Sequence, residues 1–310
     1  MRIVLMANES VGYECLKALV DADQDLLAVV TDARHANTIW RNLKLKRLAE
    51  EANVPHLQTR NINEPEFVAR LEELSPDIIF NIAFVQIYKA PVLAIPRLGA
   101  INFHPGPLPK YGGSNGWVWA IINGDTEYGV AFHYMKEKVD TGAILGIERF
   151  PIEQDETGLS LLTKCYAHGA RLFERILPDI LNNTIVPVSQ DLEERSYFYN
   201  RAPNEGFIDV RWSAGRIERF VRALDFSPLP NPLSPPKIKA AGKDLIVSAA
   251  RIVTDADSTE SEPGEVLEIR DDVLVVQTGD GVVGLTIAKR GDRDGDAGIA
   301  NVSKGDVVGG

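Results

Sequence analysis

The sequence has few cysteines, a deficit of positive charge and no long hydrophobic run, and each shortage excludes a class of protein. Its 310 residues include two cysteines, Cys15 and Cys165, which we expect to be buried apolar side chains because they lack the spacing of a metal site. The formal charge of −11 disfavours a nucleic-acid partner, since such binding depends on Lys and Arg. Apolar runs such as DIIFNIAFV are shorter than the roughly 18 residues that cross a bilayer.

The N-terminal segment and the glycine-rich segments lack other common signals. MRIVLMANES has too short an apolar stretch for a secretory signal, so we expect a cytoplasmic protein without membrane contact. The following ANESVGYE has one glycine where a dinucleotide fingerprint needs three, which argues against NAD or FAD. YGGSNG at 111–116 lacks the lysine of a phosphate-binding loop. No histidines and carboxylates have the spacing of metal ligands, and we predict no metal site.

The first part of the chain alternates short apolar runs with helical patterns. Strands are expected at 2–7, 25–31, 77–84 and 100–104, and helices at 13–22, 41–52 and 64–74. This alternation predicts an α/β fold, a Rossmann-like, mostly parallel sheet with helices on both faces, over residues 1–182. In such sheets ligands bind at the carboxyl ends of the strands. Residue 104 therefore falls at the edge where a site is expected.

The pattern changes after residue 182. Residues 183–206 show little periodicity and are predicted to be a linker. A helix with Ser213 as its N-cap follows, and then antiparallel strands separated by turns such as GKD and GDG. We expect a smaller C-terminal β-rich domain over 207–310, similar to an OB-like barrel.

The stretch AINFHPGPLP at 100–109 places Asn102 and His104 where a buried strand should still be apolar. Two residues apart on a strand, they point to the same face, and Asp140 occupies a turn that a mixed sheet can bring to the same edge. Together these groups can perform acyl transfer to an amine. The Asn amide donates to an oxyanion, His moves protons, and Asp raises the pKa of the imidazole.

The sequence resembles the folate-dependent formyltransferases. The resemblance rests on IPRLGAINFHPGPLPKYGG, AIINGDTEYGV and VDTGAIL, and RAPNEGFIDVRWSAGRIERFVRALD looks like the start of the family's C-terminal domain. It implies that Asn102, His104 and Asp140 are catalytic and that 10-formyltetrahydrofolate is the formyl donor. It also implies that the loop AFVQIYKAPVL contacts the folate, with Phe84, Gln86 and Ile87 as the candidate residues.

The resemblance leaves open which amine accepts the formyl group. Many relatives read His-x-Ser-Leu-Leu-Pro where this chain reads HPGPLP, and the part from residue 201 on has 14 basic against 18 acidic residues. We therefore predict a small-molecule amine as acceptor, with a nucleotide-linked amino sugar first. A hydroxyornithine-type amine, methionyl-tRNA, water in a formyl-folate hydrolase, and a non-catalytic folate-binding module remain alternatives. A homodimer is left open.

Further residues are predicted on the acceptor side of the site. One of Trp117 and Trp119 is expected to pack in the core and the other to stack on a substrate ring, because two positions apart on a helix do not share a face. Trp117 is the one predicted to contact the substrate. His133 is expected to be a packed histidine without a role. The complete predicted acceptor set is Tyr111, Trp117, Tyr199, Arg201 and Asn204, with Arg201 facing a phosphate.

Overall fold

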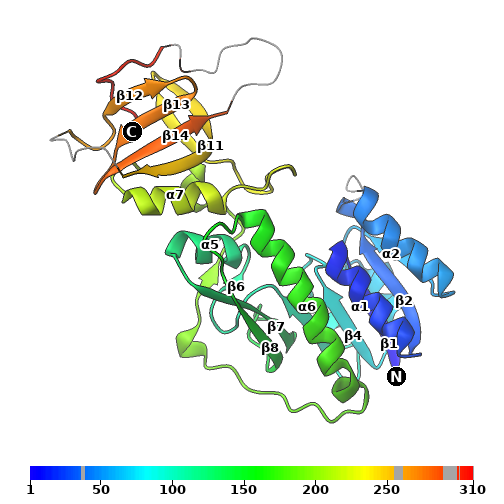
Figure 1. Cartoon of the computed structure of the whole chain (residues 1–310). Coiled ribbons are helices and arrows are strands. Elements are labelled where there is room, and N and C mark those ends of the chain that lie inside the picture. Colours follow the sequence, from blue (N-terminus) through cyan, green and yellow to red (C-terminus); the bar gives the residue numbers. More distant parts are fainter. Residues whose placement is uncertain (36–38, 255–260, 289–298, 300, 310) are drawn as a thin grey trace. The chain divides into compact units, whose positions relative to one another are not determined.

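The computed structural model describes residues 1–35, 39–254, 261–288, 299 and 301–309 (Figure 1). The chain divides into two compact units. The first comprises Met1–Gly116, Tyr128–Phe150 and Thr163–Phe198, and the second comprises Trp117–Glu127, Pro151–Leu162 and Tyr199–Gly310. The domain boundaries at 182 and 207 stay predictions.

A seven-stranded sheet forms the centre of the first unit. Its strand order is β3-β2-β1-β4-β5-β7-β8. The pairs β1/β2, β2/β3, β1/β4 and β4/β5 are parallel, whereas β5/β7 is antiparallel. The strands are β1 Arg2–Ala7, β2 Asp25–Asp32, β3 His56–Thr59, β4 Ile78–Ile82, β5 Ala100–His104, β7 Glu127–Tyr134 and β8 Ile144–Pro151. The strand order reverses at β1 and β4, which is where such sheets hold ligands at the carboxyl ends of their strands.

Helices cover both faces of this sheet because its central strands are apolar on both sides. On one face, Val4 and Met6 of β1 share a buried cluster with Leu71 of the helix α3. On the other face, Phe80 of β4 packs edge-to-face on Phe173 of α6, with ring centroids 5.2 Å apart. Figure 1 shows α1 and α6 lying along that sheet. The helices of this unit are α1 Glu9–Asp21, α2 Ile39–Glu51, α3 Pro65–Leu74, α4 Ala90–Leu93 and most of α6 Gly158–Leu181, while α5 Gly116–Asn123 belongs to the second unit from Trp117 on.

The second unit contains a five-stranded antiparallel sheet and the helix α7, Ala214–Ala223. The strand order is β10-β11-β14-β13-β12, and α7 packs against β11. The Ser213 side chain accepts a hydrogen bond from the Arg216 amide and so caps α7, as predicted. The strands are β10 Lys237–Ala240, β11 Lys243–Val253, β12 Val266–Arg270, β13 Val273–Gln277 and β14 Val282–Ile287.

The predicted fold class is confirmed, with a mostly parallel, helix-covered sheet and a smaller β-rich part. Two strand pairings were not predicted. β3 is only four residues long and carries the polar sequence HLQT. Within the segment predicted to be a linker, β9 (Tyr197–Phe198) pairs in parallel with β6 (Gly112–Gly113). A two-residue strand leaves no periodicity to detect. In the described ranges no helix is long and apolar enough to cross a membrane.

Candidate active site

The polar residues Asn102 and His104 lie at the carboxyl end of β5. Phe103 between them packs against α6, so Asn102 and His104 point to the opposite face of the sheet. The strand register pairs Asn102 with Asn81 of β4 on one side and with His133 of β7 on the other. Three polar side chains therefore lie side by side across three strands.

Asp140 joins this row from the segment between β7 and β8. Its Oδ2 lies 3.7 Å from His104 Nδ1, and its Oδ1 lies 3.4 Å from His133 Nε2. The Gly113 backbone N–H donates to the carboxylate at 2.7 Å. Asp140 adopts a left-handed backbone with φ 58°, and the Gln190 amide donates to its carbonyl at 3.1 Å, which holds the turn.

The structure thus brings together the three residues predicted to be catalytic. His104 is 4% exposed and Asp140 is buried, while Asn102 is half-buried and so has the most accessible polar group of the three. Across the described part of the chain, no three His, Cys, Asp or Glu side chains are grouped to hold a metal ion. The three side chains supply an amide donor and a buried imidazole–carboxylate pair, groups that can donate to an oxyanion and move protons.

Burial changes the expected electrostatics of this pair. Burial lowers the pKa of His104, and the nearby charge of Asp140 opposes this effect without overcoming it. The predicted effect of the carboxylate, which raises the pKa of the imidazole, is present, but desolvation of the imidazolium outweighs it and the net pKa is lowered. For Asp140, burial raises the pKa, but the other contacts of the carboxylate, among them the hydrogen bond donated by the Gly113 N–H, outweigh burial and hold the pKa well below its usual range. At neutral pH the site therefore holds a neutral His104 and an ionised Asp140.

The backbone carbonyl of Tyr111 determines which nitrogen of His104 carries the proton. His104 Nε2 lies 2.8 Å from this oxygen, which can only accept, so Nε2 is the protonated nitrogen. Nδ1 is then unprotonated and faces Asp140. The Tyr111 ring is buried and stacks on Phe198 with centroids 5.4 Å apart and an interplanar angle of 14°. The Tyr111 backbone therefore holds His104, and the predicted contact of Tyr111 with an acceptor stays a prediction.

Comparison with known proteins adds to this geometry. Residues 1–177 match the sequence model described as formyl transferase, and residues 201–295 match the formyl transferase C-terminal domain. The chain belongs to the formyl transferase family. The predicted resemblance is therefore confirmed, and the protein is a formyltransferase.

Three similar proteins illustrate the range of this family. The formyltransferase is 35% identical over 228 residues to the bifunctional polymyxin resistance protein ArnA of Wigglesworthia glossinidia brevipalpis, which is 72% of this chain but only 34% of that protein. It is 31% identical to the methionyl-tRNA formyltransferase of Lachnospira eligens, covering 91% of this chain and 89% of the relative. Its fold matches the crystal structure of WlaRD, a sugar 3N-formyl transferase, with a TM-score of 0.69, 20% identity, and coverage of 94% and 98% of the two chains.

The loop of this formyltransferase that was predicted to contact folate follows β4. The side chain of Phe84 is 2% exposed and belongs to the apolar core, so only its backbone is left for a ligand. Gln86 Oε1 accepts a hydrogen bond from the Ile62 amide at 2.8 Å, which anchors the loop. Ile87 is 64% exposed and Val85 is 69% exposed. Val85 was missed by sequence reasoning, although it alternates with Ile87 in the same loop.

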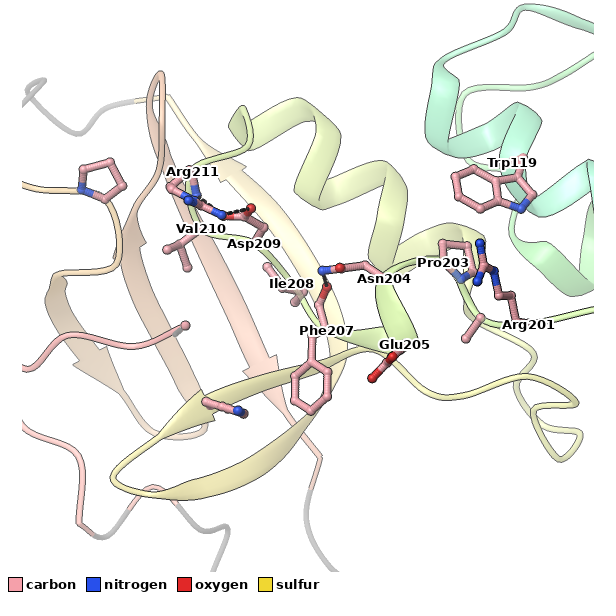
Figure 2. A pocket seen from close by; sticks show the side chains of 14 residues that line it. Trp119, Arg201, Pro203, Asn204, Glu205, Phe207, Ile208, Asp209, Val210 and Arg211 are labelled. Carbon is pink, nitrogen blue, oxygen red and sulfur yellow. Dashed lines mark hydrogen bonds and ion pairs between the residues drawn. The ribbon is translucent and has the colours of Figure 1, made fainter. Parts of the chain in front are cut away.

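Two of the predicted acceptor residues line a pocket of about 1040 Å³ in the second unit. Arg201 and Asn204 are both on its wall, together with Trp119, and Figure 2 shows Trp119 and Arg201 at the same end. Trp117 is instead buried and does not line the pocket, and its contact with a substrate stays a prediction. Tyr199 is exposed and is also not among the lining residues.

Sequence reasoning missed three polar residues beside Asn102. His133 was assigned no role, yet its Nε2 lies 3.0 Å from Asn102 Nδ2. Asn81 Nδ2 donates to Asn102 Oδ1 at 2.6 Å, and the Tyr88 hydroxyl donates to Asn81 Oδ1 at 3.0 Å. The available signal was Asn81 itself, a polar residue in the otherwise apolar run DIIFNIAF. A polar side chain inside a buried strand needs a partner there.

Proposed function

We propose that this enzyme transfers the formyl group of 10-formyltetrahydrofolate to the amine of a small molecule, with a nucleotide-linked amino sugar as the acceptor. The observation that carries the proposal is the convergence of Asn102, His104 and Asp140 at the carboxyl end of β5. The structure of WlaRD, whose fold this chain shares, was determined in the presence of dTDP and 5-N-formyl-THF, which supports both substrates. A cytoplasmic location remains part of the proposal.

The residues divide the reaction between them. The folate supplies a formyl group already activated for attack, so no serine or cysteine nucleophile is needed. Asn102 Nδ2 donates to the formyl oxygen as negative charge develops there, a contribution that is worth about 10²- to 10³-fold in rate at comparable sites. His104, neutral in the resting enzyme, takes the proton that the attacking amine loses. Asp140 stabilises the imidazolium through the charge interaction seen in the structure. The bond between the formyl carbon and the folate nitrogen then breaks, and the same proton passes to that nitrogen, so tetrahydrofolate leaves and His104 is neutral again.

His104 must exchange one partner during this step. Its Nε2–H donates to the Tyr111 carbonyl, and its free nitrogen, Nδ1, faces Asp140 in a buried site. An amine therefore reaches the imidazole only when the ring or the Tyr111 segment shifts as substrates bind. Catalytic hydrogen bonds that form only in the substrate complex are common in enzymes.

The loop after β4 fits the folate. Val85 and Ile87 present two exposed apolar side chains beside the strand that carries Asn81. Exposed apolar side chains placed together favour contact with a flat, apolar ring face, such as that of the pterin. The buried Phe84 and the anchored Gln86 keep the loop in place.

The acceptor is inferred from charge and from the pocket. The acidic balance of the chain and of the part from residue 201 on gives little surface for a polynucleotide. Arg201 in the pocket of the second unit supplies a guanidinium suited to a phosphate group, and Trp119 supplies an aromatic surface suited to a base. Both features favour a nucleotide-linked small molecule.

Release of tetrahydrofolate tests this proposal. The purified full chain is mixed with 10-formyltetrahydrofolate and one amine at a time: nucleotide-linked amino sugars, hydroxyornithine and charged initiator tRNA. We expect release that depends on an amino sugar and is lost in His104→Asn. The matched control is His168→Asn, which removes a histidine bonded to Glu148 elsewhere in the fold. Release without any amine would instead indicate a hydrolase.

Formylation of methionyl-tRNA is the second candidate, because the relative from Lachnospira eligens is aligned over nine-tenths of this chain. This candidate predicts tight, salt-sensitive retention of initiator tRNA in filter binding, since polynucleotide affinity falls steeply with salt. Weak retention that changes little with salt would contradict methionyl-tRNA as the acceptor and favour a small molecule.

A further inference from the structure

A row of buried and partly buried hydrogen bonds runs across the sheet through the amide of Asn102. The Tyr88 hydroxyl donates to Asn81 Oδ1 at 3.0 Å, and Asn81 Nδ2 donates to Asn102 Oδ1 at 2.6 Å. Asn102 Nδ2 then lies 3.0 Å from His133 Nε2, and His133 Nδ1 lies 2.8 Å from the Tyr134 carbonyl oxygen. Each group along this row donates to the next one in the same direction.

The groups at the two ends of this row of hydrogen bonds, the Tyr134 carbonyl and the Tyr88 hydroxyl, allow the bonds to run in one direction only. A backbone carbonyl cannot donate, so the bond to Tyr134 requires the proton of His133 to sit on Nδ1. At the other end Tyr88 is 3% exposed, and burial raises the pKa of its hydroxyl well above the ordinary value, so this group keeps its proton. Its donation to Asn81 Oδ1 turns the Asn81 amide nitrogen toward Asn102.

We propose that Tyr88, Asn81 and His133 are positioning residues that fix the orientation of the Asn102 amide, with His133 donating from Nδ1 and accepting at Nε2. The proposal rests on the proposed function, in which Asn102 is the donor to the formyl oxygen. An amide nitrogen carries two hydrogens. One is used by His133, and no described protein group accepts the other, which leaves it for the substrate.

The reversed orientation of the Asn102 amide would leave a buried hydroxyl without its acceptor. With Oδ1 of Asn102 toward His133, its nitrogen would face Asn81, and Asn81 would in turn present its nitrogen to the Tyr88 hydroxyl. The buried hydroxyl proton would then lose Asn81 Oδ1, the acceptor that it has in the structure. Leaving a buried donor unsatisfied is costly, so the orientation seen here is the stable one.

The charged group that faces His133 favours the opposite placement of its proton, on Nε2. Asp140 Oδ1 lies 3.4 Å from His133 Nε2, and the ring of His104 lies 6.4 Å from that of His133 between centroids. A proton on Nε2 would satisfy the carboxylate, but it would oppose the N–H of Asn102 at 3.0 Å. The shorter contact and the two fixed ends of the row favour an unprotonated Nε2.

Through Tyr88, this row of hydrogen bonds also connects the loop after β4 to Asn102. Tyr88 follows Ile87 directly in the loop that we propose to contact the folate. Its hydroxyl reaches the catalytic amide through Asn81 alone. The loop that holds the formyl donor is thereby bonded to the group that activates its formyl oxygen.

The orientation can be measured without any activity. In protein labelled with ¹⁵N-histidine, two-dimensional NMR separates the protonated from the unprotonated ring nitrogen, and the His133 signals are assigned by their loss in His133→Gln. We expect Nδ1 protonated and Nε2 unprotonated at neutral pH in the unmodified chain. A proton on Nε2, alone or together with one on Nδ1, would overturn the proposed orientation.

Kinetics test the consequence for the reaction. We expect kcat to fall about 100-fold in His133→Leu, which lacks an acceptor, and only about 10-fold in His133→Gln, whose Oε1 can accept from Asn102. Tyr88→Phe keeps the buried ring and should lower kcat about five-fold. In all three variants the KM for the folate should change less than two-fold, because the amide acts on the transition state.

Thr31→Val is the matched control for Tyr88→Phe, since it removes another buried hydroxyl. The partner of that hydroxyl is His56, at 3.0 Å. This control variant should leave kcat unchanged. Equal losses in His133→Leu and His133→Gln, or an unchanged kcat in Tyr88→Phe, would refute the positioning role. Absence of transfer by the unmodified enzyme would refute the proposed function, whereas the NMR measurement tests the amide by itself.

Discussion

Replacing Gly106 by alanine should displace the His104 imidazole while leaving that residue itself unchanged. A Cβ built on Gly106 would lie 2.6 Å from His104 Nε2, 2.9 Å from the Tyr111 carbonyl oxygen and 3.0 Å from His104 Cδ2. Ordinary contacts of a Cβ begin near 3.4 Å, so the imidazole or the carbonyl must move by about 0.8 Å. The hydrogen bond between them is 2.8 Å long, and it would not survive a shift of this size intact.

The size of the effect follows from this displacement. A misplacement of about 1 Å can cost about 100-fold in rate, or roughly 2.7 kcal/mol in the barrier. Overpacking of a filled site costs roughly 1–3 kcal/mol in stability. We therefore expect Gly106→Ala to lower kcat about 100-fold and to lower the free energy of unfolding by about 1–3 kcal/mol.

Tetrahydrofolate release and urea unfolding measure the two quantities. Gly281→Ala is the matched control, because a Cβ there would meet only Ala214 Cβ at 3.7 Å. It should leave both quantities within error. Wild-type kcat and stability in Gly106→Ala would show that His104 is not held against Tyr111 as described, and the proposed role of this imidazole would fail with it.

Three further predictions follow from the same geometry. Asp140→Asn should lower kcat by on the order of 10⁴, the cost of the same exchange beside a serine-protease histidine, while the Kd for folate measured by fluorescence titration stays within two-fold; an unchanged kcat would contradict the role of the carboxylate. Burial lowers the pKa of His104 below its ordinary value of about 6.5, so the midpoint of the decline in kcat/KM at acid pH should lie below 6.5. The same depressed pKa makes the folded state bind fewer protons than the unfolded state, so the stability linked to His104 is lost as pH falls, and a midpoint above pH 6.5 would disprove the sign. Ser213→Ala removes the cap of α7 and should cost about 1 kcal/mol in urea unfolding with kcat unchanged; an undiminished stability would mean that the cap contributes nothing.

The proposed row of hydrogen bonds and the pH prediction concern different histidines. His104 is the proton acceptor, and its tautomer is determined by Tyr111. His133 accepts from Asn102, and its tautomer is determined by Tyr134. Asp140 contacts both rings, so the exchange Asp140→Asn changes the surroundings of both histidines.

Much of this protein was determined by its sequence alone. Apolar runs alternating with helical periods predict the parallel sheet and its covering helices, because the burial of both faces leaves no other pattern. Asn102, His104 and Asp140 could be predicted to meet because a strand end and a turn converge on one edge, and the order of motifs showed the family.

Tertiary structure decided what depends on register and burial. The alignment of Asn81, Asn102 and His133 in one row exists only once β4, β5 and β7 are paired, and no local pattern encodes that register. The direction of the His104 pKa was decided by desolvation, which depends on everything packed around the ring rather than on its charged neighbour. The choice of Trp119 over Trp117 at the pocket was likewise decided by which face of α5 is buried.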